Sequence, residues 1–182
     1  MKNMDYGKQN NLNISTVTDD EKTIATAVNV IFVKRQEETG EIMIAAHKRK
    51  GTKAGAGQYG LPGGTQKAGE TMEETAVREM QEELGVKLID FKWDNFFQCL
   101  VSEKLHFVHH AFVCTTWEGE FKNAEPEKHD DIEWFCLKDL PLHNFFVSKG
   151  NVINFMNGRA YDPSTNYDYK TQKKTKDDEI VK

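Results

Sequence analysis

The stretch from residue 51 to residue 86 constrains this chain most, because a glycine-rich loop runs directly into an acidic helix. Residues 51–64 hold six of the chain's thirteen glycines and end in the sequence Leu61-Pro62-Gly63-Gly64. Such a density of glycine is typical of a loop whose backbone is tightly bent or is itself functional. We therefore expect this loop and the helix that follows it to form one local unit.

The helix is predicted over Thr71–Leu84, with Gly85 as its stop. Thr71 and Glu74 have the spacing of a capping box, in which each residue binds the other's backbone at the helix start. Apolar residues recur every four positions and predict the buried stripe. They are Met72, Ala76, Met80 and Leu84.

Three carboxylates, Glu79, Glu82 and Glu83, share one face of this helix because they stand at positions i, i+3 and i+4. Their mutual repulsion weakens an isolated helix by some tenths of a kcal/mol per pair, and a bound cation would offset it. Oxygen ligands without nearby His or Cys favour Mg²⁺ or Mn²⁺ over Zn²⁺. Taken alone, the three glutamates fit a solvated acidic helix face at least as well.

The pattern around the carboxylates favours the metal. The segment from Gly64 to Val86 resembles the Nudix box, G-x5-E-x7-R-E-U-x-E-E-x-G-U, where U is a bulky apolar residue, and it matches every defined position. The matching residues are Gly64, Glu70, Arg78, Glu79, Met80, Glu82, Glu83, Gly85 and Val86.

This resemblance implies an α+β chain with the Nudix fold, an αβα sandwich around a mixed β-sheet. It also implies Mg²⁺-dependent hydrolysis of a phosphoanhydride by water, with Mn²⁺ as a substitute. Arg78 and Glu70 are expected to orient the acidic cluster through a charge-assisted pair. The implied metal ligands are the carbonyl of Gly63, Glu79, Glu82 and Glu83, one of these carboxylates serving as base, together with a later carboxylate, for which we prefer Glu127 to Glu125.

Beyond the box, residues 28–163 resemble the MutT-like nucleoside triphosphate diphosphatases. The landmarks are KRKGTKAGAGQYGLPGG at 48–64, KNAEPEKHDDIEWF at 122–135 and LPLHNFF at 140–146. The basic strand end that includes Arg49 could contact phosphates. The rings of Phe145 and Phe146 could stack on a base, although core packing suits one of these two phenylalanines better. The expected substrate-binding residues are Arg49, Leu61, Gly63, Gly64, His109, Phe145 and Phe146.

Two other functions stay open on the sequence alone. One is hydrolysis of a nucleoside diphosphate conjugate, such as a nucleotide sugar, a dinucleotide or an RNA cap. The other is a non-catalytic nucleotide sensor, although all three box glutamates are present. ADP-ribose hydrolases typically have a proline about fifteen residues after the box, and this chain has none between Pro62 and Pro126.

The rest of the chain predicts one domain over residues 22–161, between a flexible segment at 1–21 and a polar tail at 162–182. Strands are expected at 24–33, 41–48, 91–101, 105–117 and 132–137, and a second helix within 142–156.

Charge and composition limit the kinds of partner that the chain is expected to bind. A net charge of −5 argues against a nucleic-acid polymer, and no apolar run approaches the roughly 20 residues that span a bilayer. Three scattered cysteines indicate buried thiols in a cytoplasmic protein. The expected partners are a nucleotide substrate and, because relatives are often homodimers, a second copy of the chain.

Overall fold

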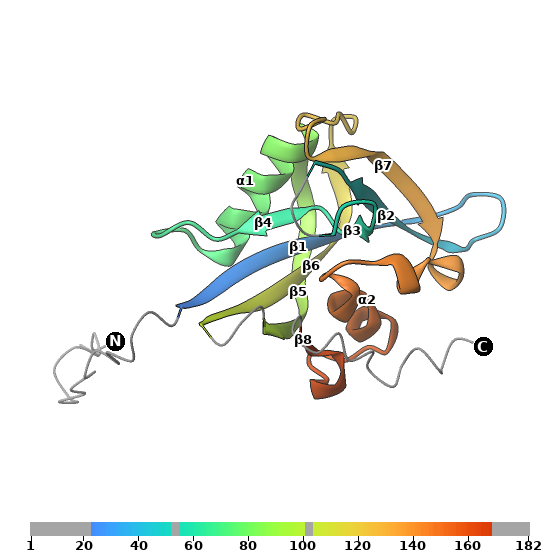
Figure 1. Cartoon of the computed structure of the whole chain (residues 1–182). Helices are drawn as coiled ribbons and strands as arrows, with labels where there is room; N and C mark the ends of the chain where they lie inside the picture. Colours follow the sequence, from blue (N-terminus) through green and yellow to red (C-terminus); the bar gives the residue numbers. More distant parts are fainter. Residues whose placement is uncertain (1–22, 52–54, 101–103, 169–182) are drawn as a thin grey trace, which may run out of the picture.

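The computed structural model describes residues 23–51, 55–100 and 104–168, so the flexible segment expected at 1–21 lies outside the described part. A mixed sheet carries one helix on each face (Figure 1). The strands and helices are β1 Thr23–Arg35, β2 Ile42–Arg49, β3 Tyr59–Gly60, β4 Gly63–Thr65, α1 Met72–Leu84, β5 Lys87–Leu100, β6 Leu105–Glu118, β7 His129–Cys136, α2 Lys149–Met156 and β8 Tyr167–Asp168.

Strand β1 is the centre of the sheet. One of its edges pairs in parallel with β6 from Thr23 to Phe32, and β6 pairs antiparallel with β5. The other edge is shared, since Ala27–Asn29 pair antiparallel with β4 whereas Val33–Arg35 pair antiparallel with β2. Strand β7 pairs with β2. The parallel and antiparallel pairs together confirm the mixed sheet.

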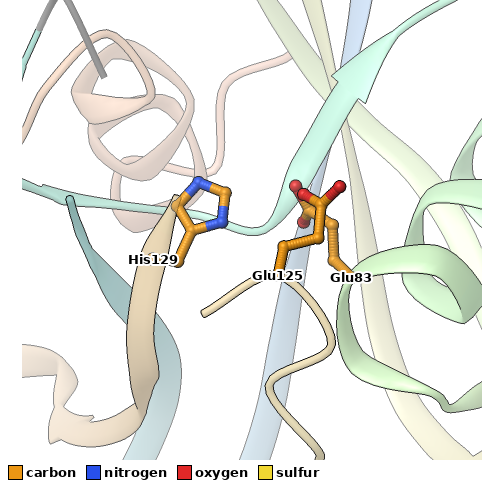
Figure 2. A group of neighbouring side chains, drawn as sticks. All are labelled: Glu83, Glu125 and His129. Atoms are coloured by element: carbon orange, nitrogen blue, oxygen red, sulfur yellow. The ribbon is translucent and has the colours of Figure 1, made fainter. Parts of the chain in front are cut away.

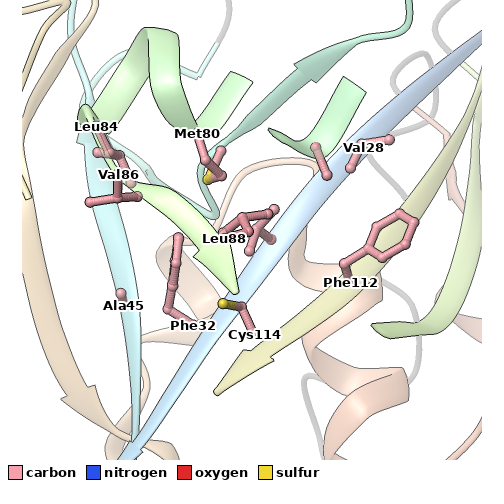
Figure 3. Packing of buried hydrophobic residues seen from close by; sticks show 11 residues of the cluster. Val28, Phe32, Ala45, Met80, Leu84, Val86, Leu88, Phe112 and Cys114 are labelled. Atoms are coloured by element: carbon pink, nitrogen blue, oxygen red, sulfur yellow. The ribbon is translucent and has the colours of Figure 1, made fainter. Parts of the chain in front are cut away.

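The alternation of side chains along β1 builds two cores on opposite faces of the sheet. Val28, Val30 and Phe32 pack in one cluster with residues of α1, and Figure 3 shows Val28 and Phe32 in this cluster. Ile31 lies in a second cluster, together with Val152 of α2. The two clusters, one on each face, confirm the αβα sandwich.

Helix α1 begins and ends where the sequence predicts. The Thr71 hydroxyl accepts a hydrogen bond from the Glu74 amide, and the Glu74 carboxylate accepts one from the Thr71 amide, so the capping box is complete. Gly85 ends the helix in the left-handed region with a φ of 65°. The predicted stripe is buried at Ala76, Met80 and Leu84, while Met72 packs half-buried against the same cluster.

The late helix, Lys149–Met156, lies within the predicted range 142–156 and follows a separate 3-10 turn at Leu142–Asn144. Strands β5 and β7 begin earlier than predicted, at Lys87 and His129. The fold also continues past residue 161: Thr165 is buried in the 3-10 turn Pro163–Thr165, and β8 pairs with β5. The polar composition after Asp162 hid this last strand. No helix among the described residues is long and apolar enough to cross a membrane.

Candidate active site

Two adjacent glycines allow β4 to fit between β1 and α1. Gly63 has a φ of +149°, and a Cβ there would lie 2.0 Å from the Val28 carbonyl oxygen. A Cβ on Gly64 would lie 2.3 Å from Cδ of Glu79. Side chains at these positions would therefore push β4 off β1 or displace the carboxylate of Glu79. The glycines bring the backbone of β4 into direct contact with the acidic face of α1.

Arg78 organises this acidic face. Its Nε and Nη2 donate to the two carboxylate oxygens of Glu70 at 2.6 and 3.0 Å. Its Nη1 donates to Glu79 at 2.6 Å and to Glu82 at 2.9 Å, and Nη2 also donates to the Thr65 carbonyl at 3.1 Å. The planar guanidinium thus fixes three carboxylates and the end of β4 at once.

The same contacts set the charge of the cluster. The Arg78 guanidinium holds the pKa of Glu70 at about 2 and also lowers the pKa of Glu82. Glu70 accepts further hydrogen bonds from the Lys67 amide and the Thr75 hydroxyl. These carboxylates are therefore ionised at neutral pH.

Glu83 has a different environment, because it is only 6% exposed. Burial raises its pKa to about 8, and the charges of Glu79 and Glu125 act in the same direction. The Gly63 amide donates to its carboxylate at 2.9 Å and opposes that rise. A buried carboxylate among like charges is a group that a nearby cation would stabilise.

The later carboxylate that reaches this cluster is Glu125, whereas the sequence favoured Glu127. Donor atoms of Glu83, Glu125 and His129 all lie within 4.8 Å of one another, as Figure 2 shows. Glu127 is exposed and does not line the same hollow. The turn Glu125–His129 makes the difference, since hydrogen bonds from the Lys128 and His129 amides to the Glu125 carbonyl fold it back.

These side chains line a hollow of about 460 Å³, which we call the acidic hollow. Its carboxylates come from α1 and from the turn before β7, and its cations are spread around them. The charged residues and histidine lining it are Glu79, Glu82, Glu83, Glu125, Arg49, Lys67, Arg78, Lys128 and His129.

A second hollow of about 450 Å³, the aromatic hollow, adjoins the acidic one, and both are lined by Arg49, Gly63, Gly64 and Thr65. It continues between β1 and the segment before α2. Its other lining residues are Ala27, Val28, Asn29, Gly60, Leu61, Cys99, Phe107, His109, Phe146, Val147 and Ser148.

The expected substrate-binding residues divide between this hollow and the core. Arg49 lies over the ring of Phe146, 4.9 Å from its centroid, and both line the aromatic hollow with Leu61 and His109. Phe145, in contrast, is 5% exposed and packs in the core, with its ring centroid 6.2 Å from that of Tyr59. The assignment of Phe145 to the substrate is therefore wrong, because the chain there sends consecutive side chains to opposite sides.

A buried chain of amide groups behind the aromatic hollow was not predicted. Asn29 donates to Asn151 at 2.8 Å, and Asn151 donates to Asn95 at 2.8 Å. Asn29 also lies 3.4 Å from Nδ1 of His109, whose ring stacks on Phe97. An Asn within the apolar run 24–33 was the available signal, since a buried amide requires partners.

The acidic hollow fits a divalent metal ion. Carboxylate oxygens of Glu79, Glu82 and Glu83 with Glu125 are hard ligands of the kind that Mg²⁺ and Mn²⁺ take. The buried, like-charged surroundings of Glu83 are the structural observation that favours a cation there. An ion held by these residues would neutralise phosphate charge and lower the pKa of a bound water.

The chain is similar in sequence to known proteins. The NUDIX domain model matches residues 23–154. The "8-oxo-dGTP diphosphatase" of Escherichia coli is 31% identical over 136 residues, which cover 72% of this chain and 95% of that protein. A nudix hydrolase of Caenorhabditis elegans is 28% identical over 117 residues, 60% of this chain but only 28% of that protein's length.

A solved structure shows the same likeness in three dimensions. The MutT NUDIX hydrolase from Burkholderia pseudomallei superposes with a TM-score of 0.64 at 26% identity, covering 73% of this chain and 98% of that one. Residues 23–154, which the NUDIX domain model matches, contain the glycine pair, the helix α1 and its carboxylates. The chain therefore belongs to the NUDIX domain family and is a MutT-like Nudix hydrolase.

Proposed function

We propose that the protein hydrolyses a nucleoside or deoxynucleoside triphosphate, in normal or oxidised form, to the monophosphate and pyrophosphate with Mg²⁺ as cofactor and Mn²⁺ as its substitute. The observation that carries this proposal is the junction of the acidic and aromatic hollows at Gly63 and Gly64. A nucleoside in one hollow would place its phosphates directly in the other.

In the acidic hollow, Glu79, Glu82, Glu83 and Glu125 would hold the metal together with the Gly63 carbonyl. The bound ion would supply charge neutralisation and a water of lowered pKa. Arg78 and Glu70 would serve as positioning residues. Glu70 holds the Arg78 guanidinium in a bidentate pair, and that guanidinium in turn holds the carboxylates of Glu79 and Glu82. Such preorganised charge is a main source of catalysis in phosphoryl transfer.

In the aromatic hollow, the Phe146 ring would stack on the base, which is worth about 1–3 kcal/mol and tolerates any base. Arg49 lies over that ring and also lines the acidic hollow, so its guanidinium is placed to reach a phosphate. His109 and Leu61 line the same hollow and would contact the nucleoside. The likeness to the "8-oxo-dGTP diphosphatase" of Escherichia coli supports an oxidised purine triphosphate as one substrate.

The test is a product-resolved substrate panel. Normal and oxidised nucleoside triphosphates, nucleotide sugars, dinucleoside polyphosphates and capped RNA are each incubated with the protein and Mg²⁺. The proposal expects pyrophosphate and a monophosphate from at least one triphosphate, at a higher kcat/KM than from any conjugate. A preference for a conjugate, or release of orthophosphate, would contradict it.

A further inference from the structure

His129 brings a nitrogen ligand to the acidic hollow. Glu83 comes from α1, Glu125 from the turn before β7, and His129 is the first residue of β7, and Figure 2 shows the three side chains converging. Their donor atoms lie within 4.8 Å of one another. Two ligands that each lie about 2.0–2.3 Å from one ion are at most about 4.6 Å apart. A side-chain shift of a few tenths of an ångström would therefore let all three bind one ion.

The environment of the His129 imidazole also indicates that it could bind an ion. His129 is only 7% exposed and lines the acidic hollow. Its ring stacks on His47, with centroids 3.9 Å apart and planes at 9°, but within the described part of the chain neither ring nitrogen has a hydrogen-bond partner. Neither nitrogen is among the fully buried side-chain atoms that lack a partner, so both are accessible from the solvent side and available to an ion in the acidic hollow.

The backbone holds this imidazole in place. The His129 amide donates to the Glu125 carbonyl at 3.1 Å, and the His129 carbonyl accepts from Asn123 at 2.9 Å. His129 also pairs with Arg49 in the β2–β7 ladder. The ring is thus fixed by β7, by the turn and by the stack on His47 before any ion binds.

We propose that Glu83, Glu125 and His129 form a mixed carboxylate–imidazole site that binds a divalent transition ion, such as Mn²⁺ or Co²⁺, more tightly than it binds Mg²⁺. Imidazole is a ligand that first-row transition ions favour, whereas Mg²⁺ prefers oxygen alone. The inference rests on the proposed function, because Glu83 also belongs to the Mg²⁺ site proposed there.

The experiment measures metal binding by the full chain without substrate. Co²⁺ and Mg²⁺ affinities are determined by calorimetry for the wild type, His129→Phe and His129→Cys, with His143→Phe as a control at an exposed histidine. Phenylalanine keeps a ring to stack on His47 but removes the nitrogen, and cysteine restores a soft ligand. Thermal melts check that each variant folds.

The expected result is a selective loss. Removal of a residue that only orients a metal ligand lowers metal affinity about 10–100-fold. His129→Phe removes a ligand itself, so Co²⁺ binding should weaken at least ~10-fold. Mg²⁺ binding should change little, and His129→Cys should recover Co²⁺ binding. Equal Co²⁺ affinity in the wild type and His129→Phe would overturn the inference.

Pulsed EPR of bound Mn²⁺ gives a readout that needs no variant, since a coordinated imidazole produces coupling to ¹⁴N. Its absence from the wild-type spectrum would also overturn the inference. If the protein hydrolyses a triphosphate with Mg²⁺ but binds Co²⁺ without His129, the proposed function holds and this inference fails. If Co²⁺ binding depends on His129 but no triphosphate is hydrolysed, this inference holds and the proposed function fails.

Discussion

At the scale of single residues, one guanidinium group binds three glutamates. Arg78 bridges Glu70 to Glu79 and Glu82, which line the acidic hollow and are two of the proposed metal ligands. Its own pKa is raised well above its usual range, mainly by the hydrogen bond to Glu70. The guanidinium therefore keeps its positive charge beside these carboxylates.

Glu82→Gln tests the carboxylate assignment. The amide keeps the shape of the side chain but loses the charge, so kcat should fall by about 10²–10³-fold, as when other preorganised electrostatic groups are removed. Glu73→Gln is the matched control, because Glu73 is exposed on the same helix and lies outside the box. Steady-state kinetics with Mg²⁺ and a thermal melt measure both variants. Near-normal turnover by a folded Glu82→Gln protein would refute the assignment.

The adjacent phenylalanines give a second test. Phe146→Ala should weaken nucleotide binding by about 1–3 kcal/mol through lost stacking and so raise KM. Phe145→Ala removes a buried core ring and should lower the free energy of unfolding by about 3–5 kcal/mol. Urea unfolding and KM measurements on both variants separate the two roles. The assignment fails if Phe145→Ala raises KM while its stability is unchanged.

At the scale of elements, α1 depends on its cap to present the carboxylates. Thr71→Ala removes the hydroxyl that accepts from the Glu74 amide, so the free energy of unfolding should fall by about 1 kcal/mol. Thr71→Ser keeps that oxygen and should restore most of the loss. Urea unfolding monitored by circular dichroism measures the difference. Equal stability of the alanine and serine variants would show that the cap contributes little.

Elements with local signals could be predicted from the sequence. Thr71, Glu74 and Gly85 determine the ends of α1 through bonds made within a few residues. A continuous run of β-branched and apolar residues predicted the central strand at 24–33. The box glutamates converge because helical spacing alone puts them on one face. These features need no knowledge of the rest of the fold.

Other features depend on contacts between distant segments. Glu125 rather than Glu127 faces Glu83 because of a backbone turn that composition does not reveal. Phe145 packs in the core and Phe146 lines the hollow at a point where Phe145 forms a β-bridge with the distant Tyr59. The pairing of β8 with β5 joins positions 68 residues apart, Cys99 and Tyr167, through a strand of two residues. Such short, polar elements carry no periodicity to detect.

At the scale of the whole molecule, stability should depend on pH through His109, which is half-buried at the aromatic hollow. Burial lowers its pKa from 6.5 to about 4, so the unfolded chain binds a proton that the folded chain excludes between these values. The contribution of the uncharged His109 to the free energy of unfolding is complete above pH 6.5. It is lost as the pH falls towards 4, and the free energy of unfolding then changes by at most about 1.4 kcal/mol per pH unit.

The measurement is the free energy of unfolding at pH 7.5 and pH 5 for the wild type, His109→Gln and His143→Gln. His109→Gln should show a smaller loss of stability at pH 5 than the wild type. His143→Gln, at an exposed position, should behave as the wild type does. An unchanged pH dependence in His109→Gln would mean that His109 is protonated in the folded protein.

The sandwich as a whole explains why one reaction suits this chain. Strand β1 carries β4 on one edge and β6 on the other, so the glycine pair meets α1 on one side and the aromatic hollow on the other. The nucleoside triphosphate that we propose as substrate would span both. The cleavage position follows from which phosphate lies beside Glu79, Glu82 and Glu83.

Product identification tests this central claim most directly. ³¹P NMR of the protein with Mg²⁺ and the best triphosphate of the panel follows every phosphorus species during turnover. The account predicts equal amounts of pyrophosphate and nucleoside monophosphate, and neither product above background with Glu82→Gln. Orthophosphate with a nucleoside diphosphate, or the same pyrophosphate release by Glu82→Gln, would contradict it.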